Sequence, residues 1–456
     1  MNRILRGTAL NNFGKTSQWF AFGILKFREK FGQILIVAAG IVFLFLLTLV
    51  KSKTSPDFRI EPTLFIYTIF VSSFALSRLV GAIFYEASFS RVASRENIDA
   101  VLKGIYQPFV TFVIPCKNEE KDIANTVRKC FEADYPREKT EIIVINDGST
   151  DKTIDVLRGL EASIPSMKII DWKINRGKRH AMAEGFRQAK GEIVVQLDSD
   201  SFIDPGSFYH LLVPFAEPEI GAVCAHADPQ NSEKNILTKM QAAYYFMSFR
   251  ILKAAESTFL SVFCCSGCSS AYRKDLVLPI LDRWTNEKFL GLPATWGDDR
   301  SLTSWILKSG SKTIYTDEVQ AYTIVPEKVK QLMKQQLRWK KSWIVNAIIT
   351  SRFIFKKQPF VALFYFLPLI IISLVTPFMA LRALIYLPVF QSEMPYFYIL
   401  GVLLVTSLFA LYCLILEKRK TYWPYLFLWS LLNFFVLAPL LIYAAIRIQD
   451  RGWGTR

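Results

Sequence analysis

Two aspartates one residue apart are the first feature of this sequence that could do chemistry. Residues 196–200 read Gln-Leu-Asp-Ser-Asp and overlap the end of an apolar run at 193–197. Asp198 and Asp200 would repel each other unless a cation lies beside them, and Mg²⁺ or Mn²⁺ prefers such oxygen ligands and bridges them to substrate phosphates. The alternative is a solvated acidic turn. The position after an apolar strand favours a divalent metal site.

A second acidic motif also follows an apolar run. Residues 146–151 read Asn-Asp-Gly-Ser-Thr-Asp, directly after the run 142–145. A carboxylate at the C-terminal tip of a parallel strand lies where open α/β sheets bind ligands. Asp147 can therefore accept hydrogen bonds from a base or a ribose. The alternative is a plain strand-to-helix turn in which Asp or Ser caps the next helix.

Two cations lie between these motifs in the sequence. Residues 177–181 read Gly-Lys-Arg-His-Ala. Lys178 could neutralise a diphosphate as it leaves, whereas the structural alternative is an exposed basic loop. His180 taken singly indicates a structural residue rather than a catalytic one.

A third acidic pair lies further along, in Trp-Gly-Asp-Asp-Arg at residues 296–300. Transfer of a group to a hydroxyl needs a base near the attacking oxygen. We expect Asp299 to be that base, with Arg300 as its orienting partner. The alternative is a buried structural Asp–Arg pair.

Residues 335–339 read Gln-Gln-Leu-Arg-Trp, within a predicted helix. The indole of Trp339 can stack on a sugar ring, and Gln335 and Arg338 can bind hydroxyl or phosphate oxygens. As an isolated pattern the segment could be an amphipathic anchor. The run Cys-Cys-Ser-Gly-Cys at 264–268 has no partner ligands for redox or metal chemistry, so we interpret it as a tight loop near the acceptor.

These residues need a scaffold, and the middle of the chain predicts one. Apolar strand-like runs at 109–114, 142–145 and 193–197 alternate with helix-like segments such as 122–131. Short apolar strands separated by helices indicate an α/β domain with a parallel sheet.

The two ends of the chain are apolar enough for a membrane. Mean hydropathy is +0.25, and twenty uncharged residues lie between Lys30 and Lys51, about one bilayer crossing. A second span is expected from Pro62 to about Tyr85, with Arg78 inside it facing a protein-lined path. The positive-inside rule places the N-terminus in the cytosol, because cations precede the first span: Arg3, Arg6, Lys15, Lys26, Arg28 and Lys30, against Glu29.

The C-terminal part has apolar stretches at 358–381, 383–392, 394–416 and 421–446. Three simple spans would leave the tail outside, whereas splitting 358–392 around Pro377 would return it to the cytosol. Residues 327–357 alternate cations with apolar side chains and predict amphipathic helices at the membrane interface.

The net charge of +16 has no nucleic-acid reader motif beside it, so membrane topology explains it best. Seven scattered cysteines and three histidines argue against a disulfide framework or a structural zinc site. No pattern indicates an oligomeric state.

Together and in this order, the motifs resemble the processive inverting family of GT-A glycosyltransferases, which includes cellulose, chitin and hyaluronan synthases. The match covers about 108–345 and the extreme C-terminus. The resemblance implies a Rossmann-like mixed α/β GT-A domain joined to an α-helical transmembrane domain. The expected divisions are 1–86 with two transmembrane helices, 87–325 cytosolic and catalytic, 326–357 interfacial, 358–447 with three or four crossings, and 448–456 as a cytosolic tail.

The resemblance also implies a role for each matching residue, in a protein of the plasma membrane with UDP-sugars, a growing polysaccharide and membrane lipids as partners. Asp299 would be the base, and Asp200 and Asp198 would hold Mg²⁺ or Mn²⁺. The donor would be bound by Asp147, Lys178, Asp198, Arg338, Trp453 and Arg456. The acceptor would be bound by Ser266, Gly267, Asp298, Gln335 and Trp339.

Within the family the closest likeness is to hyaluronan synthases, through 177–181, 264–267, 297–303, 334–342 and the terminal Trp-Gly-Thr-Arg. That ending lies near the cytosolic active site in the group and favours an even number of crossings. Cys268, Ser269 and Ser301 depart from the usual pattern. The expected activity is alternate addition of GlcNAc and glucuronate. The rivals are a chitin or poly-GlcNAc synthase, a polyprenyl-phosphate sugar transferase, and a non-catalytic scaffold or transporter.

Overall fold

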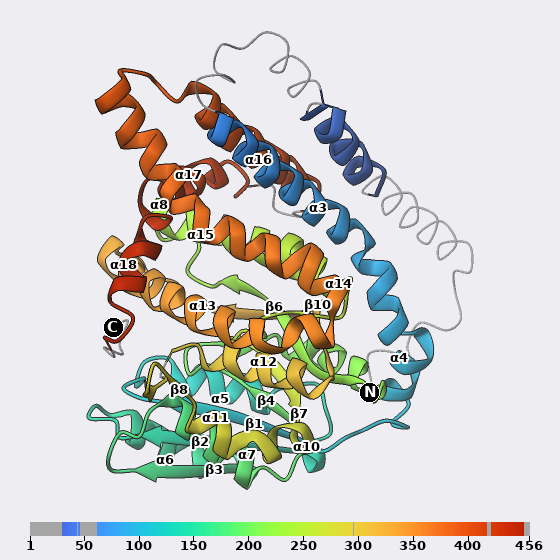
Figure 1. The fold of residues 1–456 in the computed structure, drawn as a ribbon. Coiled ribbons are helices and arrows are strands. Elements are labelled where there is room, and N and C mark those ends of the chain that lie inside the picture. The colour runs from blue at the N-terminus through green and yellow to red at the C-terminus, as the bar shows by residue number, and fades with distance from the viewer. Residues whose placement is uncertain (1–29, 43, 46–61, 295, 417–420, 451–456) are drawn as a thin grey trace.

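The computed structural model describes residues 30–42, 44–45, 62–294, 296–416 and 421–450 (Figure 1). A layered α/β domain lies at one side, and long helices from both ends of the chain lie together at the other (Figure 1). The long helix α13 (Val329–Lys357) runs between the two parts.

The centre of the α/β domain is a mixed sheet, which has eight strands in the described residues, in the order β3-β2-β1-β4-β7-β6-β10-β5. Strands β3, β2, β1 and β4 are parallel, while β7 runs antiparallel to both β4 and β6. The strands are β1 (Val110–Cys116), β2 (Thr140–Asp147), β3 (Met167–Trp172), β4 (Ile193–Gln196), β5 (Phe202–Ile203), β6 (Ile220–Pro229), β7 (Ser270–Arg273) and β10 (Lys312–Thr323), with β8 (Lys288–Phe289) and β9 (Leu292–Pro293) as a separate hairpin.

The expected α/β architecture is confirmed, and the apolar runs form its central strands. Every residue of β1 is buried, as expected for a parallel strand that is covered on both faces. Helix α7 packs on β1 and β2. The helices of this domain are α4 (Arg95–Leu102), α5 (Ile123–Phe131), α6 (Thr153–Glu161), α7 (Lys178–Gln188), α8 (Ile236–Met247), α9 (Ala254–Ser257), α10 (Lys274–Val277), α11 (Leu281–Thr285) and α12 (Asp298–Ser309).

Four helices of the described chain are long and apolar enough to cross a membrane: Pro62–Val92, Pro359–Gln391, Tyr398–Leu416 and Tyr425–Ile446. A shorter apolar helix spans Lys30–Val42, while the rest of the first expected crossing lies largely outside the described residues. The elements are α3 (Pro62–Val92), α14 (Pro359–Val361), η6 (Ala362–Phe366), α15 (Leu367–Leu381), η7 (Arg382–Gln391), α16 (Tyr396–Leu416), α17 (Tyr425–Leu432), the π-helical turn η8 (Asn433–Leu437) and α18 (Leu440–Ile446).

Helix α3 joins the membrane part to the α/β domain. It runs past the expected boundary at residue 86, and Gly81 lets it lie directly against α9, because an added Cβ would come within 2.9 Å of the Ala255 Cβ. Arg78 is 5% exposed, with its guanidinium 3.8 Å from the centroid of the Tyr365 ring. Arg78 therefore faces the protein interior, but it is not among the residues that line the central cavity, and its place on a protein-lined path stays a prediction.

The C-terminal helices follow a path that neither sequence interpretation described. Pro377 lies inside the continuous α15, so 358–392 is not split there. Both ends of the last apolar segment contact the α/β domain or α13 instead. Before α17, the hydroxyl of Tyr422 is 2.8 Å from that of Ser232, and after α18 the Lys341 ammonium donates to the carbonyl of Asp450 at 3.0 Å. The segment therefore begins and ends on the side of the α/β domain (Figure 1).

Candidate active site

The carboxyl ends of the central strands open into a cavity of about 910 Å³. It extends from the strand ends past α13 to the apolar helices α15 and α18, so one space joins the α/β domain to the membrane part. The predicted site residues on its wall are Lys178, Asp198, Asp200, Ser266, Gly267, Asp298, Asp299, Gln335, Arg338 and Trp339.

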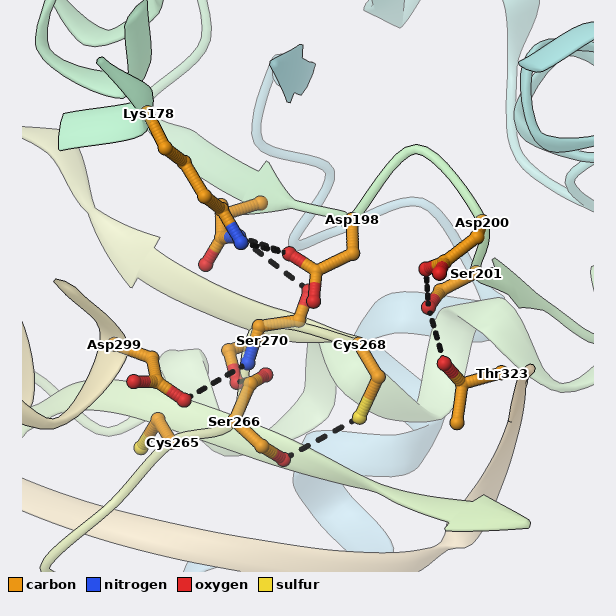
Figure 2. A network of polar contacts seen from close by, with 12 residues as sticks. Lys178, Asp198, Asp200, Ser201, Cys265, Ser266, Cys268, Ser270, Asp299 and Thr323 are labelled. Carbon is orange, nitrogen blue, oxygen red and sulfur yellow. Dashed lines mark hydrogen bonds and ion pairs between the residues drawn. The ribbon is translucent and has the colours of Figure 1, made fainter. Parts of the chain in front are cut away.

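Asp198 follows β4 and is held from two directions (Figure 2). Its backbone N–H donates to the carbonyl of Gly267 at 2.9 Å. Its carboxylate forms an ion pair with Lys178, the first residue of α7. Burial lowers the pKa of Lys178, but the carboxylates of Asp198, Asp298 and Asp299 outweigh it and raise the pKa above its ordinary value. The site therefore keeps a fixed cation beside Asp198.

Asp200 lies two residues further on, at the same end of the sheet. The Ser201 hydroxyl is 3.2 Å from its Oδ1 and 2.9 Å from the hydroxyl of Thr323 on β10 (Figure 2). No group of three or more His, Cys, Asp or Glu side chains among the described residues could hold a metal unaided. Two carboxylates still fit Mg²⁺ or Mn²⁺, because such ions take one or two protein carboxylates and complete their shell with phosphate oxygens and water.

Asp299 lies in the first turn of α12, where the helix dipole favours a carboxylate. Its Oδ1 accepts from the backbone N–H of Arg300 at 2.8 Å, and its Oδ2 accepts from the N–H of Gly267 at 3.4 Å. The Cys264 thiol is 3.6 Å from the same Oδ2. The predicted orienting contact from Arg300 is thus made by its backbone, and Asp299 is aimed at the cavity by three neighbours.

The buried Asp–Arg pair considered for Asp299 exists, but at Asp298. The Arg179 Nε donates to Asp298 Oδ1 at 2.9 Å, and the Arg179 Nη1 lies 3.3 Å from a carboxylate oxygen of Glu287. All three groups are buried. Asp298 borders the cavity, yet this ion pair holds its carboxylate, so the two adjacent aspartates have different environments.

The loop 264–268 lies between Asp198 and Asp299. At Gly267 an added Cβ would approach the Oδ1 of Asp198 to 2.8 Å, so a larger residue would force the carboxylate or the loop to shift. The buried Lys253 supports the loop from below by donating to the carbonyl of Cys264. Burial, with the nearby Asp299, raises the pKa of Cys264 to about 12, which keeps the thiol protonated at neutral pH. This agrees with a positioning loop rather than a thiolate site.

Helix α13 provides the opposite wall. Gln335, Arg338 and Trp339 share one face, because residues three and four apart are neighbours on a helix. Gln335 is 9% exposed, and its Oε1 accepts no hydrogen bond from any described residue. A buried acceptor without a partner at a cavity wall is suited to a ligand hydroxyl.

Asp147 and His180 are not among the residues that line the cavity. Asp147 is 4% exposed, is absent from the cavity wall, and accepts from the backbone N–H groups of Arg176 at 2.6 Å and Gly177 at 2.9 Å. It therefore shapes the loop that leads into α7, and its contact to a donor stays a prediction. His180 is exposed. Trp453 and Arg456 fall outside the described residues.

Several wall residues had no place in the sequence prediction. Lys253 lies in no motif that the sequence analysis recognised. Lys340 lay inside the basic segment without being singled out. Asn433 had a visible signal, since it is an amide within the apolar stretch 421–446.

The fold and this site match known glycosyltransferases. Residues 111–279 match glycosyl transferase family 2. A hyaluronan synthase of Streptococcus pyogenes serotype M1 is 30% identical over 372 residues, covering 78% of this chain and 87% of that protein. An N-acetylglucosaminyltransferase of Azorhizobium caulinodans is 30% identical over 356 residues, covering 76% and 87%.

Among solved structures, the mannosyltransferase PcManGT from Pyrobaculum calidifontis, in complex with GDP-Man and Mn²⁺, shares the fold. The TM-score is 0.53 at 21% identity, covering 81% of this chain and 98% of that one. The strand order, the acidic site and these likenesses agree, and the chain belongs to family 2 of the glycosyltransferases.

Proposed function

We propose that this protein is a membrane polysaccharide synthase of the hyaluronan synthase type, which polymerises UDP-GlcNAc and UDP-glucuronate and exports the chain. The observation that carries the proposal is the single cavity that runs from Asp198 and Asp299 to α15 and α18. A transferase that releases its product to the cytosol needs no such opening. A polysaccharide cannot cross lipid unaided, because its polar groups would lose their hydrogen bonds.

Asp299 is the base of the proposed reaction. Its carboxylate accepts the proton of the acceptor hydroxyl as that oxygen attacks the anomeric carbon from the face opposite UDP. The C–O bond to the diphosphate breaks on the other side, so the configuration inverts. The N–H groups of Gly267 and Arg300 keep the carboxylate directed at the acceptor.

Lys178, Asp198 and Asp200 form the donor end of the proposed site. Lys178 is close enough to share its charge between Asp198 and a departing diphosphate. A Mg²⁺ or Mn²⁺ ion bound at Asp200 and Asp198 would neutralise charge on the diphosphate. Arg338 lines the same cavity and is suited to phosphate oxygens, while Trp339 offers a stacking surface for the acceptor sugar.

The proposed orientation places the α/β domain in the cytosol and the apolar helices in the plasma membrane. The first two apolar helices cross and return, and 359–391 and 398–416 do the same. The last apolar segment then ends where it began, against the catalytic side, through Tyr422 and Asp450. An even number of crossings follows without splitting α15, and the described start of the tail, at Asp450, lies on the cytosolic side.

A two-donor assay tests the proposed polymer. Purified protein with Mg²⁺ or Mn²⁺ should make long product only when UDP-GlcNAc and UDP-glucuronate are both present. Long product from UDP-GlcNAc alone would instead support the second candidate, a chitin or poly-GlcNAc synthase, which the likeness to an N-acetylglucosaminyltransferase favours. A lipid-extractable product carrying one sugar would indicate a polyprenyl-phosphate transferase.

A further inference from the structure

The membrane end of the cavity is built from neutral side chains. Helix α15 contributes Ile372, Ser373, Thr376 and Pro377, and the last apolar segment contributes Asn433, Ala438 and Leu441. Neither group contains a carboxylate or a cation. This end of the cavity is therefore unsuited to a diphosphate or a metal ion, and its polar capacity is limited to an amide and hydroxyls.

Asn433 is an unusually polar residue for the segment in which it lies. It is the only Asn, Gln or charged residue of Tyr425–Ile446, a segment apolar enough to cross a membrane. Its side chain is exposed and makes no hydrogen bond or ion pair with any residue that the structure describes. An unpaired amide in apolar surroundings is costly. The amide at the cavity wall is consequently available to a polar ligand inside the cavity.

The helix is distorted in a way that turns Asn433 toward the cavity. In a regular α-helix, Asn433 and Leu441 would lie roughly 80° apart around the axis. The π-helical turn η8 closes with the N–H of Ala438 donating to the Asn433 carbonyl at 2.7 Å, five residues back. That wider turn takes up about one extra residue and brings the two side chains to within roughly 20° of the same face.

Ser373 of α15 lines the same end of the cavity, and its hydroxyl makes no hydrogen bond within the described chain. The neighbouring Thr376 is different, because its hydroxyl is bound to the Ile372 carbonyl and contacts the hydroxyl of Tyr67 on α3. Two uncommitted groups, an amide and a hydroxyl, therefore border the same cavity as Trp339.

We propose that Asn433, with Ser373, forms a sugar-binding position at the membrane end of the cavity, which holds the polymer by hydroxyl or acetamide groups as it leaves Trp339. This inference rests on the proposed polysaccharide synthase function. Neutral hydrogen bonds suit this task, because each must be made and broken whenever the chain advances. The position lowers the rate at which an unfinished chain is lost and therefore lengthens the product.

Product length and UDP release, measured on the full-length purified protein with both UDP-sugars and Mg²⁺, separate this role from catalysis. Asn433→Ala should shorten the mean product about fivefold, as expected for one lost hydrogen bond to the chain. The KM for each donor and the initial rate of UDP release should stay near wild type. Asn433→Leu should shorten the product at least as much, and Ser373→Ala less.

Ser430→Ala is the matched control. Ser430 lies one turn before Asn433, but its hydroxyl is bound to that of Thr406 on α16, 2.9 Å away, outside the cavity wall. Its product should keep the wild-type length. The inference fails if Asn433→Ala makes product of wild-type length, or if only the bulkier Leu shortens it, because the effect would then be steric.

The identity of the polymer is decided separately from the role of Asn433. If the wild type makes long chains from UDP-GlcNAc alone, the hyaluronan assignment fails, and the same length comparison in that donor still decides the role of Asn433. If the wild type only ever transfers a single sugar, the proposed function and this inference are both overturned.

Discussion

The two ends of the cavity hold their polar groups in different ways. At the α/β end, the Asp198 carboxylate pairs with Lys178, and the Asp299 carboxylate accepts from the backbone N–H groups of Gly267 and Arg300. At the membrane end, the side chains of Asn433 and Ser373 make no hydrogen bond or ion pair with any residue that the structure describes. Chemistry requires charges that are oriented before the reaction starts, whereas a moving polymer requires contacts that exchange. We therefore associate bond formation with the α/β end of the cavity and movement of the polymer with the membrane end.

Asp299→Asn should cause the largest loss of activity at the α/β end. Loss of a general base should lower the rate of UDP release by about 10²–10⁴-fold, while thermal stability stays near wild type. The adjacent Asp298→Asn is the contrasting variant. It breaks the buried pair with Arg179, and removing one partner of such a pair costs about 3–5 kcal/mol, so it should unfold at a clearly lower temperature. Equal behaviour of the two variants would contradict the separate roles.

Gly267→Ala tests whether the α/β end depends on fixed geometry. The added Cβ would lie 2.8 Å from Asp198 Oδ1, so the carboxylate or the loop must shift. A displacement near 1 Å can lower kcat by about 10²-fold, and we expect a raised Mn²⁺ requirement as well. The control is Gly159→Ala in α6, where an added Cβ meets nothing within 4 Å. Unchanged metal dependence in Gly267→Ala would argue against Asp198 as a ligand.

The α/β end was the more predictable of the two from sequence. Asp198 and Asp200 follow an apolar strand, and parallel strand ends share one edge of a sheet, so their position at the cavity follows from a local pattern. Asp299 was found from its motif. Asp147 met the same rule and still turned toward the N–H groups of Arg176 and Gly177. Strand position predicts the edge of the sheet but not the direction of a side chain.

The membrane end depends on contacts that no local pattern encodes. Apolar stretches predicted the helices, but their length alone does not tell whether a segment crosses or returns. The return of 425–446 depends on Tyr422 reaching Ser232, 190 positions earlier. The cavity-facing position of Asn433 depends on a single wide turn, which has no residue signature. Tertiary packing decides both features.

Lys340 gives a further test of the difference between the two ends, because it is a cation in a partly apolar part of the cavity wall. Burial lowers its pKa to about 8, compared with about 10.4 for an exposed lysine. Its charge is therefore present below pH 8 and lost as the pH rises through that value. If this charge attracts the donor, KM for UDP-sugars should rise about fivefold between pH 7 and pH 9. Lys340→Arg stays protonated and should remove the dependence, and an identical profile in both proteins would exclude Lys340.

The smallest effect is expected where the two ends are joined, at Tyr365 of η6. Its hydroxyl donates to the buried carboxylate of Glu256 at 2.7 Å, and Glu256 in turn accepts from the N–H of Phe263, directly before the loop 264–268. Tyr365→Phe should cost about 1 kcal/mol in unfolding free energy, since one hydrogen bond is lost. The exposed Tyr443→Phe on α18 is the control and should cost nothing measurable. If Tyr365→Phe also lowers kcat without changing product length, the packing of the membrane helices positions the catalytic loop, because a purely local contact would leave kcat unchanged.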